Sequence, residues 1–361
     1  MNKAAEKFDW IEVIRFPLMI GVVLIHTSDP IKGLGGTMVS LQGRNNLADE
    51  VMYLLSQILA RLSVPAFFVF AGFFFIKATH KNGIINWGVQ LKKKIGTLVI
   101  PFIFWNAVVM CLFYFGQKSG FVPVGPGSRK GDIENLSIWG LFDLLVGATR
   151  HPAAYQFWFM RDLILCIVFS LPLIFLSQAV YLMVLMSVGV IWFFELGIFD
   201  IPSLAAIFFF CLGGAFGINN SLLKFNNSDL KIKILIIFFI LMCLNLFLRD
   251  YLYVKYIHRI YLILGIFSIY PIAEFILQFR RISKWLKLQS AVTFFLFALH
   301  EPFLMLVKKI VFGISSWNGL VGVLFAYVFP VFVVVVIVGW IYKIILQIAP
   351  KFLAFSTGGR S

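Results

Sequence analysis

The sequence predicts an all-α polytopic membrane protein with about ten transmembrane helices and both termini in the cytoplasm. Of its 361 residues, 61% are hydrophobic and 13% are charged, whereas a soluble domain carries about a quarter charged residues. The apolar residues form runs long enough to cross a bilayer. The net charge of +15 does not indicate nucleic acid, because the positive residues lie in short loops between these runs. Such loops set topology and meet anionic lipid head groups.

The apolar runs define one integral-membrane domain over 1–361, with no internal repeat. The predicted spans are about 10–28, 53–76, 95–116, 157–178, 180–195, 203–218, 234–248, 260–278, 291–311 and 319–346. The fifth to seventh spans are the shortest. With the N-terminus inside, the inner segments carry 17 Lys and Arg residues and the outer segments carry 11, which favours this orientation.

The first span carries three ionisable residues among aliphatic ones, namely Glu12, Arg15 and His26. An ionisable group inside a span costs about 3 kcal/mol on insertion scales and usually marks a function. Arg15 and His26 are eleven residues apart, so they leave the helix within about 20° of each other and roughly 16 Å apart along its axis. A cation near one membrane surface and a titratable base near the other therefore lie on one stripe.

Each of these residues also has a structural explanation. Arg15 can extend to the inner interface, or pair with Glu12 three residues earlier. His26 can be a hydrogen-bonded histidine that caps the outer end of the helix. Their position on one stripe favours instead a channel wall or the binding path of a long, narrow substrate.

The second span contains Arg61 deep within an apolar run. This cation needs an anionic or carbonyl partner, which either a ligand or another helix would supply. Pro65 is expected to kink the helix and free a backbone carbonyl. Ala71 and Gly72 allow a close contact with another helix.

Ionisable residues also flank the third and fourth spans. Lys92–Lys94 are either a topology signal beside lipid phosphates or a clamp for the phosphates of an anionic cofactor at the inner surface. Trp158 suits the aromatic belt of the outer interface. Arg161 and Asp162 are adjacent, so we expect them to point to different sides of the helix and not to neutralise each other. At least one of them then faces the protein interior.

His300 and Glu301 lie in the middle of the ninth span and are followed by Pro302. Two adjacent ionisable groups at this depth indicate a function, with a structural hydrogen-bond network as the alternative. The outer segment RDYLYVKYIHR is either an aromatic belt or a platform for a sugar or an anionic glycan. All four cysteines lie inside apolar runs, so we predict neither a disulfide nor a Cys-ligated metal, and no metal site is assigned.

The ionisable residues belong to elements that resemble acyltransferase family 3, the multi-span membrane O-acyltransferases that modify surface polysaccharides. The first element is an acidic residue followed by Arg, ten residues and His, here Glu12, Arg15 and His26. The stretch SVPAFFVFAGFFF is similar to the second-helix pattern of the family, with Ala71 in place of the usual Ser.

Three further elements complete the resemblance in order along the whole chain. Lys94 and Thr97 stand near the places of a family Arg-x-x-Arg element ahead of Pro101. FWFMRDL and FALHEPF resemble the fourth-helix and ninth-helix signatures.

The resemblance implies transfer of an acyl group, usually acetyl, from cytoplasmic acyl-CoA to a hydroxyl of an extracytoplasmic glycan or lipid-linked sugar. Acetyl-CoA is then a donor substrate in a cell-membrane protein with no permanently bound cofactor. We expect His26 to be the general base and Arg15 to hold a donor phosphate or carbonyl. The other donor-binding candidates are Arg61, Lys93, Lys94 and Arg161, with Glu12, Trp158, Asp162, His300 and Glu301 in support.

Three alternatives stay open at this point. A covalent acyl-histidine relay at His26 would replace direct transfer. A glycan transporter would use Arg15, Arg61 and His26 as pathway residues, although the sequence lacks the paired halves with broken helices that are typical of alternating access. A purely structural membrane subunit would leave the buried ions unexplained. The oligomeric state is not predicted.

Overall fold

A computed structural model describes residues 8–32, 38–79, 83–120, 132–197, 200–219 and 227–359. In this part of the chain the only strands are β1 (Ile31–Lys32) and β2 (Met38–Val39), which pair antiparallel. The chain divides into two compact units. Unit 1 comprises Met1–Phe70 and Asn219–Ile348, and unit 2 comprises Ala71–Ile218 and Ala349–Ser361. The Gly- and Pro-rich stretch 121–131, between the third and fourth predicted spans, lies outside the described residues.

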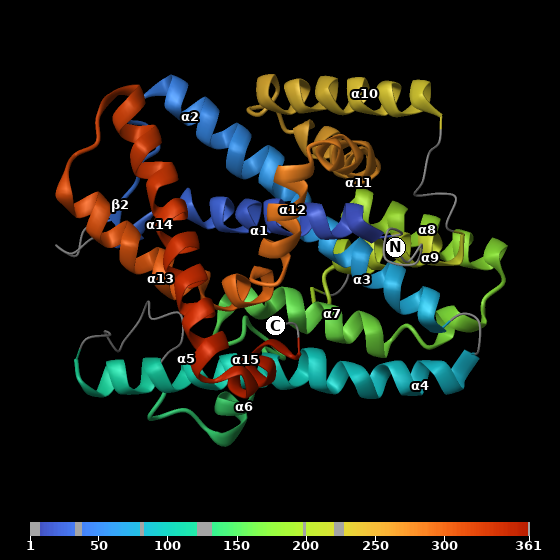
Figure 1. Cartoon of the computed structure of the whole chain (residues 1–361), viewed down its shortest axis with the longest axis horizontal. Coiled ribbons are helices and arrows are strands. Elements are labelled where there is room, and N and C mark those ends of the chain that lie inside the picture. The colour runs from blue at the N-terminus through green and yellow to red at the C-terminus, as the bar shows by residue number, and fades with distance from the viewer. Residues whose placement is uncertain are drawn as a thin grey trace. The chain divides into compact units, whose positions relative to one another are not determined.

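Unit 1 is organised around its first helix. Besides the strands it contains α1 (Asp9–Thr27), α2 (Asn46–Tyr53), the first half of α3 (Ser63–Thr79), α10 (Ser228–Phe247), α11 (Val254–Gln278), α12 (Arg280–Ser290), α13 (Thr293–Ile314) and α14 (Gly319–Ile348). Helix α1 packs against α11, α12, α13 and α14, and α10 packs on α11 (Figure 1). Trp10 meets Phe70 and Tyr270 edge to face. A side chain at Gly21 would collide with the Ser63 hydroxyl, so only glycine permits this close approach.

Between α2 and α3 the helix changes its hydrogen-bond pattern. A π-helical segment, η2 (Leu54–Leu59), is followed by a 3₁₀ turn, η3 (Ala60–Leu62), just before Pro65. Proline has no N–H, so it cannot bond the carbonyl of Arg61 four residues earlier. An irregular segment that includes Arg61 thus precedes Pro65, and the kink expected at Pro65 stays a prediction.

Unit 2 contains the long rod of α4 (Gly83–Lys94), the π-helical segment η4 (Ile95–Val99) and α5 (Ile100–Lys118), which follow one another in Figure 1. Its other elements are α6 (Ile138–Val146), η5 (Tyr155–Phe157), α7 (Trp158–Val168), η6 (Pro172–Phe175), α8 (Gln178–Phe193), α9 (Leu204–Ile218) and α15 (Pro350–Thr357). The close contact expected at Gly72 is made with α9, because an added Cβ would overlap the Phe210 carbonyl. Trp105 of α5 holds α15 through a hydrogen bond to the Ser356 carbonyl, 2.9 Å long.

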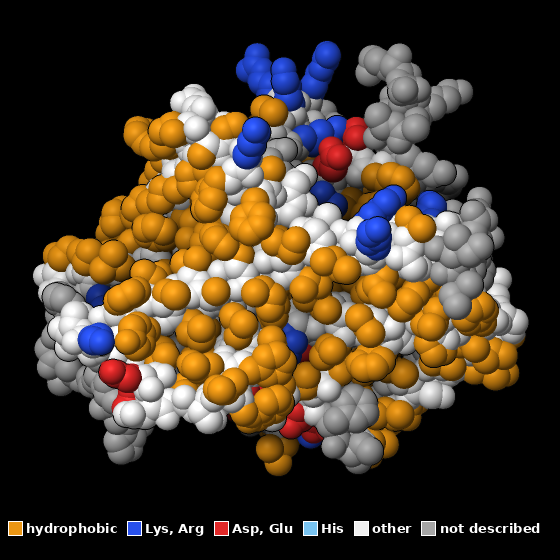
Figure 2. Space-filling view, turned by 90° about the horizontal axis from the view of Figure 1, so that it is seen from below, with side chains coloured by type: hydrophobic (Ala, Val, Ile, Leu, Met, Phe, Trp, Pro, Cys, Tyr) orange, Lys and Arg blue, Asp and Glu red, His pale blue; other side chains and the backbone are white. Residues whose placement is uncertain are grey.

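The protein is an all-α membrane protein. Within the described residues, six helical stretches are long and apolar enough to cross a bilayer, or seven if α12 and α13, bent by 70°, count as one span. The six are Asp9–Thr27, Asn46–Thr79, Asn86–Lys118, Ser228–Phe247, Val254–Gln278 and Gly319–Ile348. Across the middle of the face shown in Figure 2, hydrophobic side chains predominate, as lipid contact requires, and Lys and Arg gather toward its upper edge.

Several predicted boundaries were wrong. The predicted span 157–178 contains only the 11-residue α7 and a short 3₁₀ turn, because the chain turns before Pro172. Helices α8 and α9, with 16 and 15 residues, are shorter than a simple crossing needs. The predicted span 234–248 is too short, since α10 begins at Ser228. The basic segment 279–290 is not a loop but helix α12, which packs on α1. Ten spans and termini on one side therefore stay a prediction.

Candidate active site at the end of helix α1

The last turn of α1 uses its own hydroxyl side chains to satisfy backbone carbonyls. A helix leaves its final four carbonyls without intrahelical donors. Thr27 Oγ1 donates to the Val23 carbonyl at 3.0 Å, and Ser28 Oγ donates to the Ile25 carbonyl at 2.9 Å. These bonds define the C-terminal end of the helix immediately beside His26.

Two other helices supply the remaining donors. Tyr327 of α14 donates its hydroxyl to the Leu24 carbonyl at 3.3 Å. Lys308 of α13 donates to the carbonyls of His26 at 2.8 Å and of Asp29 at 2.6 Å. Lys308 is only 2% exposed, and a cation at a helix C-terminus is electrostatically favourable. Helices α13 and α14 thus both hold the last turn of α1.

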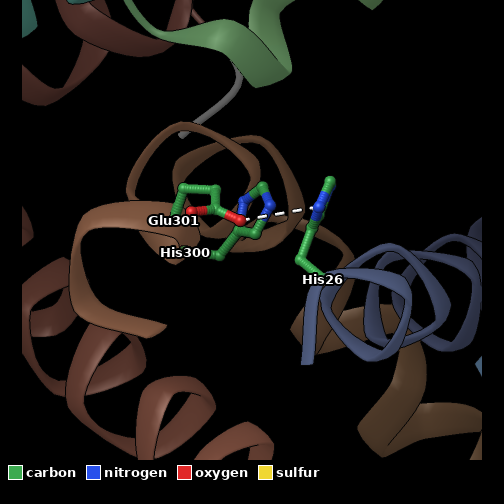
Figure 3. A group of neighbouring side chains, drawn as sticks. All are labelled: His26, His300 and Glu301. Atoms are coloured by element: carbon green, nitrogen blue, oxygen red, sulfur yellow. Dashed lines mark ion pairs between the residues drawn. The ribbon is translucent and has the colours of Figure 1, made fainter. Parts of the chain in front are cut away.

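The His26 side chain lies between two carboxylates. Its Nδ1 is 3.5 Å from Oε1 of Glu301 and 3.6 Å from Oδ2 of Asp29. Glu301 projects from α13 toward His26, as Figure 3 shows. The exposed fractions of the His26 and Glu301 side chains are 15% and 17%, so both reach the edge of the packed region. A histidine oriented by a carboxylate is the arrangement that general-base catalysis uses.

Asp29 lies just beyond the membrane-spanning helix, and its surroundings favour the ionised form of its carboxyl group. Partial burial by itself would raise the pKa of Asp29. The contact with His26 and the charges of His26, Lys308 and Arg61 outweigh this effect and lower the pKa below its ordinary value. The end of α1 therefore presents a carboxylate at neutral pH.

His300 is the third member of the group. It is fully buried, and its ring lies 5.4 Å from that of His26, centroid to centroid (Figure 3). Nδ1 of His300 lies 2.8 Å from the Phe297 carbonyl, to which it donates. Its Nε2 is buried and has no hydrogen-bond partner in the described structure. The donor atoms of His26, His300 and Glu301 all lie within 4.8 Å of one another.

Arg15 lies on α1, half-buried. The negative charge of exposed Glu12 acts on it, but no ion pair joins the two side chains. Within the described part of the chain Arg15 makes no hydrogen bond or ion pair at all. The ion pair with Glu12, one of the two structural explanations for Arg15, is therefore not formed, and the Glu12 side chain is exposed. A half-buried cation of this kind suits an external anion.

Arg61 has a partner that the sequence analysis did not name. Its Nε and Nη2 donate to Oε1 of Gln57, one turn earlier, at 3.1 and 2.6 Å. The Arg61 side chain is nevertheless exposed. A side-chain amide carbonyl thus orients the guanidinium without neutralising its charge.

Arg161 and Asp162, in unit 2, do pair, so the expectation that they would not neutralise each other is wrong. Arg161 Nη2 lies 2.9 Å from Asp162 Oδ1, and its Nη1 donates to the carbonyls of Gly147 at 2.8 Å and Arg150 at 3.2 Å. Asp162 Oδ2 accepts from the Ser203 amide at 2.8 Å. The long arginine side chain folds back over the helix start, which compensates for the diverging Cα–Cβ directions. The Arg161 guanidinium thus joins the start of α7 to the backbone at Gly147 and Arg150 within unit 2.

The remaining predicted residues of unit 2 are spread over two elements. On α4, Lys93 is exposed and Lys94 is half-buried, and Trp158, half-buried, begins α7. Lys94 borders an apolar hollow of about 210 Å³, whose other lining residues include Leu91, Ile95, Leu98, Ile164 and Val168. Among the described residues of unit 2, no hydrogen bond or ion pair joins Arg161 to Lys93 or to Lys94.

Sequence reasoning missed Lys308, Asp29 and Tyr327. Lys308 had a detectable signal, because it lies seven residues, or about two helical turns, after Glu301 within an apolar run. Two ionisable groups at this spacing share a helix face. The role of Tyr327 had no such signal, since it depends on how α14 packs against α1.

These features are those of a membrane protein whose first helix ends in a cluster of ionisable side chains. The model of the acyltransferase family, described as an acyltransferase domain, matches residues 8–342, and the chain belongs to this family, acyltransferase family 3. The protein is therefore an acyltransferase. It is 25% identical to the succinoglycan biosynthesis protein ExoH of Rhizobium meliloti (strain 1021), over 97% of this chain and 92% of that protein. No solved structure matches the chain.

Proposed function

We propose that the protein is an O-acyltransferase of the cytoplasmic membrane. It transfers an acyl group, with acetyl as the first candidate, from cytoplasmic acyl-CoA to a hydroxyl of an extracytoplasmic glycan or lipid-linked sugar. Family membership supports acyl transfer. A polysaccharide acceptor is supported by the similarity to a protein named for succinoglycan biosynthesis. Succinyl is the second candidate for the acyl group.

The observation that carries the proposal is the position of His26 Nδ1 between Glu301 and Asp29. A proton on Nδ1 points toward a carboxylate, which leaves the lone pair of Nε2 for the acceptor hydroxyl. His26 Nε2 takes the hydroxyl proton while the oxygen attacks the thioester carbonyl carbon. The carbon–sulfur bond then breaks, and the CoA thiolate receives the proton from His26. The carboxylate stabilises the imidazolium between these two steps.

The predicted donor-binding residues are retained in part. Arg15 and the oriented guanidinium of Arg61 in unit 1 are proposed to bind donor phosphates or the thioester carbonyl. Lys93 and Lys94 in unit 2 are proposed to bind the nucleotide phosphates. We assign Arg161 a structural role instead, because its guanidinium already binds Asp162 and two backbone carbonyls.

The test is transfer of radiolabelled acetyl or succinyl groups from the CoA thioester into membrane glycan and lipid-linked sugar. Wild type is compared with His26→Ala and Arg15→Ala at matched expression, with His151→Gln as a control for an exposed histidine. We expect incorporation with one donor, its loss in His26→Ala, its reduction in Arg15→Ala when the donor is below saturation, and its persistence in the control. Undiminished transfer by His26→Ala would overturn the base assignment. No transfer from either donor in wild type, with glycan export changed, would favour the transporter.

A further inference from the structure

We propose that His26, His300 and Glu301 together bind one divalent transition-metal ion, with Zn²⁺ the best fit, and that the bound ion blocks acyl transfer. The blocking effect rests on the proposed role of His26 as the general base. The binding itself rests only on the geometry of the three side chains.

The spacing of the donor atoms suits an ion better than direct contact. His26 Nδ1 and Glu301 Oε1 are 3.5 Å apart, which is longer than an ordinary nitrogen–oxygen hydrogen bond of about 2.7–3.2 Å. Tetrahedral Zn²⁺, with bonds of about 2.0–2.1 Å to nitrogen and oxygen, places neighbouring ligands about 3.3 Å apart. One atom from each of His26, His300 and Glu301 lies within 4.8 Å of the others. A small shift of side chains brings all three to bonding distance.

His300 is prepared as a ligand. Its Nδ1–H donates to the Phe297 carbonyl, which assigns the lone pair to Nε2. Metal-binding histidines almost always donate their second ring N–H in this way. Among the residues that the structure describes, no hydrogen-bond partner reaches the buried Nε2 atom, and His300 is 0% exposed. A buried polar atom without a partner is rare, and an ion is one of the explanations for it.

The site offers an open fourth position and a suitable charge. Two histidines and one glutamate are the protein ligands of a known class of zinc site, in which water or substrate completes the tetrahedron. Asp29 Oδ2, 3.6 Å from His26 Nδ1, is placed on the exposed side. The carboxylates of Glu301 and Asp29 offset the charge of Lys308, which two backbone carbonyls hold, and that of Arg61, which acts on Asp29. A divalent cation is therefore electrostatically acceptable here.

Metal binding and proton transfer compete for the same imidazole. In the proposed reaction Nδ1 of His26 carries the proton and Nε2 is the base. An ion bonded to Nδ1 uses the lone pair of that atom, so the single proton of the neutral imidazole moves to Nε2. His26 can then no longer accept a proton from the acceptor hydroxyl. Glu301 is occupied at the same time. The ion thus stops the reaction without distorting the fold.

Binding is measured on the full-length protein in detergent, after treatment with EDTA and its removal. Co²⁺ is titrated first, because its tetrahedral complexes absorb in the visible range, and Zn²⁺ is then used to displace it. We expect one Co²⁺ per chain at micromolar concentration and binding at least tenfold weaker in His300→Gln and in Glu301→Gln. His151→Gln, at an exposed histidine, and His258→Gln, at a half-buried histidine near Asn245, are expected to bind as wild type does. Thermal unfolding of each variant shows whether it is folded.

Acyl transfer by wild type is measured in the same preparation with Zn²⁺ and then with excess EDTA. We expect Zn²⁺ to reduce transfer at least tenfold and EDTA to restore it. Failure of wild type to bind Co²⁺, or equally tight binding by folded His300→Gln and Glu301→Gln, would overturn the metal site. Stimulation by Zn²⁺ would overturn the blocking role. Co²⁺ binding without transfer under any condition would contradict the proposed function and leave the metal site intact. Transfer without Co²⁺ binding would overturn the metal site and leave the proposed function intact.

Discussion

The Nζ atom of Lys308 donates a hydrogen bond to the backbone carbonyl of His26, 2.8 Å away. The two residues are far apart in sequence, on α13 and α1. The bond holds the end of the first helix against the helix that carries Glu301, so the histidine and its carboxylate keep their spacing. The buried Lys308 ammonium therefore fixes the position of the His26 backbone relative to the Glu301 carboxylate.

Replacing Lys308 by Met should reduce acyl transfer about tenfold or more and lower the unfolding temperature. The change leaves the His26 and Asp29 carbonyls without their donor, at a cost of about 1–3 kcal/mol for each buried group. Rates and thermal unfolding in detergent test this. Lys309→Met is the matched control, because Lys309 is the adjacent residue and is less buried. Equal effects of the two substitutions would show that Lys308 has no special role.

Glu301→Gln should lower the rate of transfer about a hundredfold with little change in thermal stability. The amide keeps the size of the side chain but no longer stabilises a positive imidazolium, and general acid–base catalysis contributes about 10²–10⁴-fold. The rate at saturating donor and acceptor is the measurement. Glu274→Gln is the control, since that carboxylate pairs with Lys231 at the other end of unit 1. Full activity of Glu301→Gln would remove the carboxylate from the mechanism.

Arg15→Met should raise KM for acyl-CoA about tenfold, the loss of roughly one charged hydrogen bond, without lowering the unfolding temperature. Arg15 makes no hydrogen bond or ion pair within the described residues, so the fold loses nothing that they show. Arg161→Met provides the contrast: it should unfold at a lower temperature, because Asp162 would be left as an unpaired buried charge. A similar loss of stability in both variants would make Arg15 structural.

Stability should fall on acidification because of Asp143. This buried carboxylate accepts hydrogen bonds of 2.7 Å from the amide and from the hydroxyl of Thr149, and it pairs with Arg150 at 3.0 Å. Burial would raise its pKa, but the Thr149 bonds and the Arg150 charge outweigh burial and lower it. A lowered pKa stabilises the fold above the ordinary value of about 3.9 and loses that stabilisation as pH falls through the lowered value.

The Asp143 contribution is measured as unfolding temperature against pH, between about pH 7 and pH 3, the range that brackets the ordinary carboxyl pKa. Asp143→Asn should unfold earlier than wild type at pH 7, and the difference should shrink as the pH falls. Two parallel curves would show that the Asp143 charge makes no contribution.

Gly72→Ala should destabilise the protein by about 1–3 kcal/mol, the usual effect of overpacking. The added methyl group would overlap the Phe210 carbonyl of α9, which is backbone and cannot turn aside. Chemical or thermal unfolding in detergent is the measurement. Gly339→Ala is the matched control, because nothing lies within 4 Å of its added Cβ. Equal stability of the two variants would contradict the close packing of α3 and α9.

Most of the helices could be predicted, because a long apolar run must form its own backbone hydrogen bonds in lipid. The least accurate predictions concern the region from α7 to α9, where the helices are short and the runs carry no clear boundary. Arg161 and Asp162 show a second limit. Because the two residues are adjacent, their side chains were expected to diverge. The long, flexible Arg161 side chain nevertheless brings its guanidinium to the Asp162 carboxylate.

The sequence by itself determined that this chain is an all-α membrane protein with Arg15 and His26 on one stripe, because helix periodicity and the burial of apolar residues are local properties. It also contained the motifs that indicate the acyltransferase family. Only the tertiary structure decided what surrounds His26. Glu301, His300 and Lys308 reach it from α13, and that meeting depends on how helices distant in sequence pack, which no local pattern encodes.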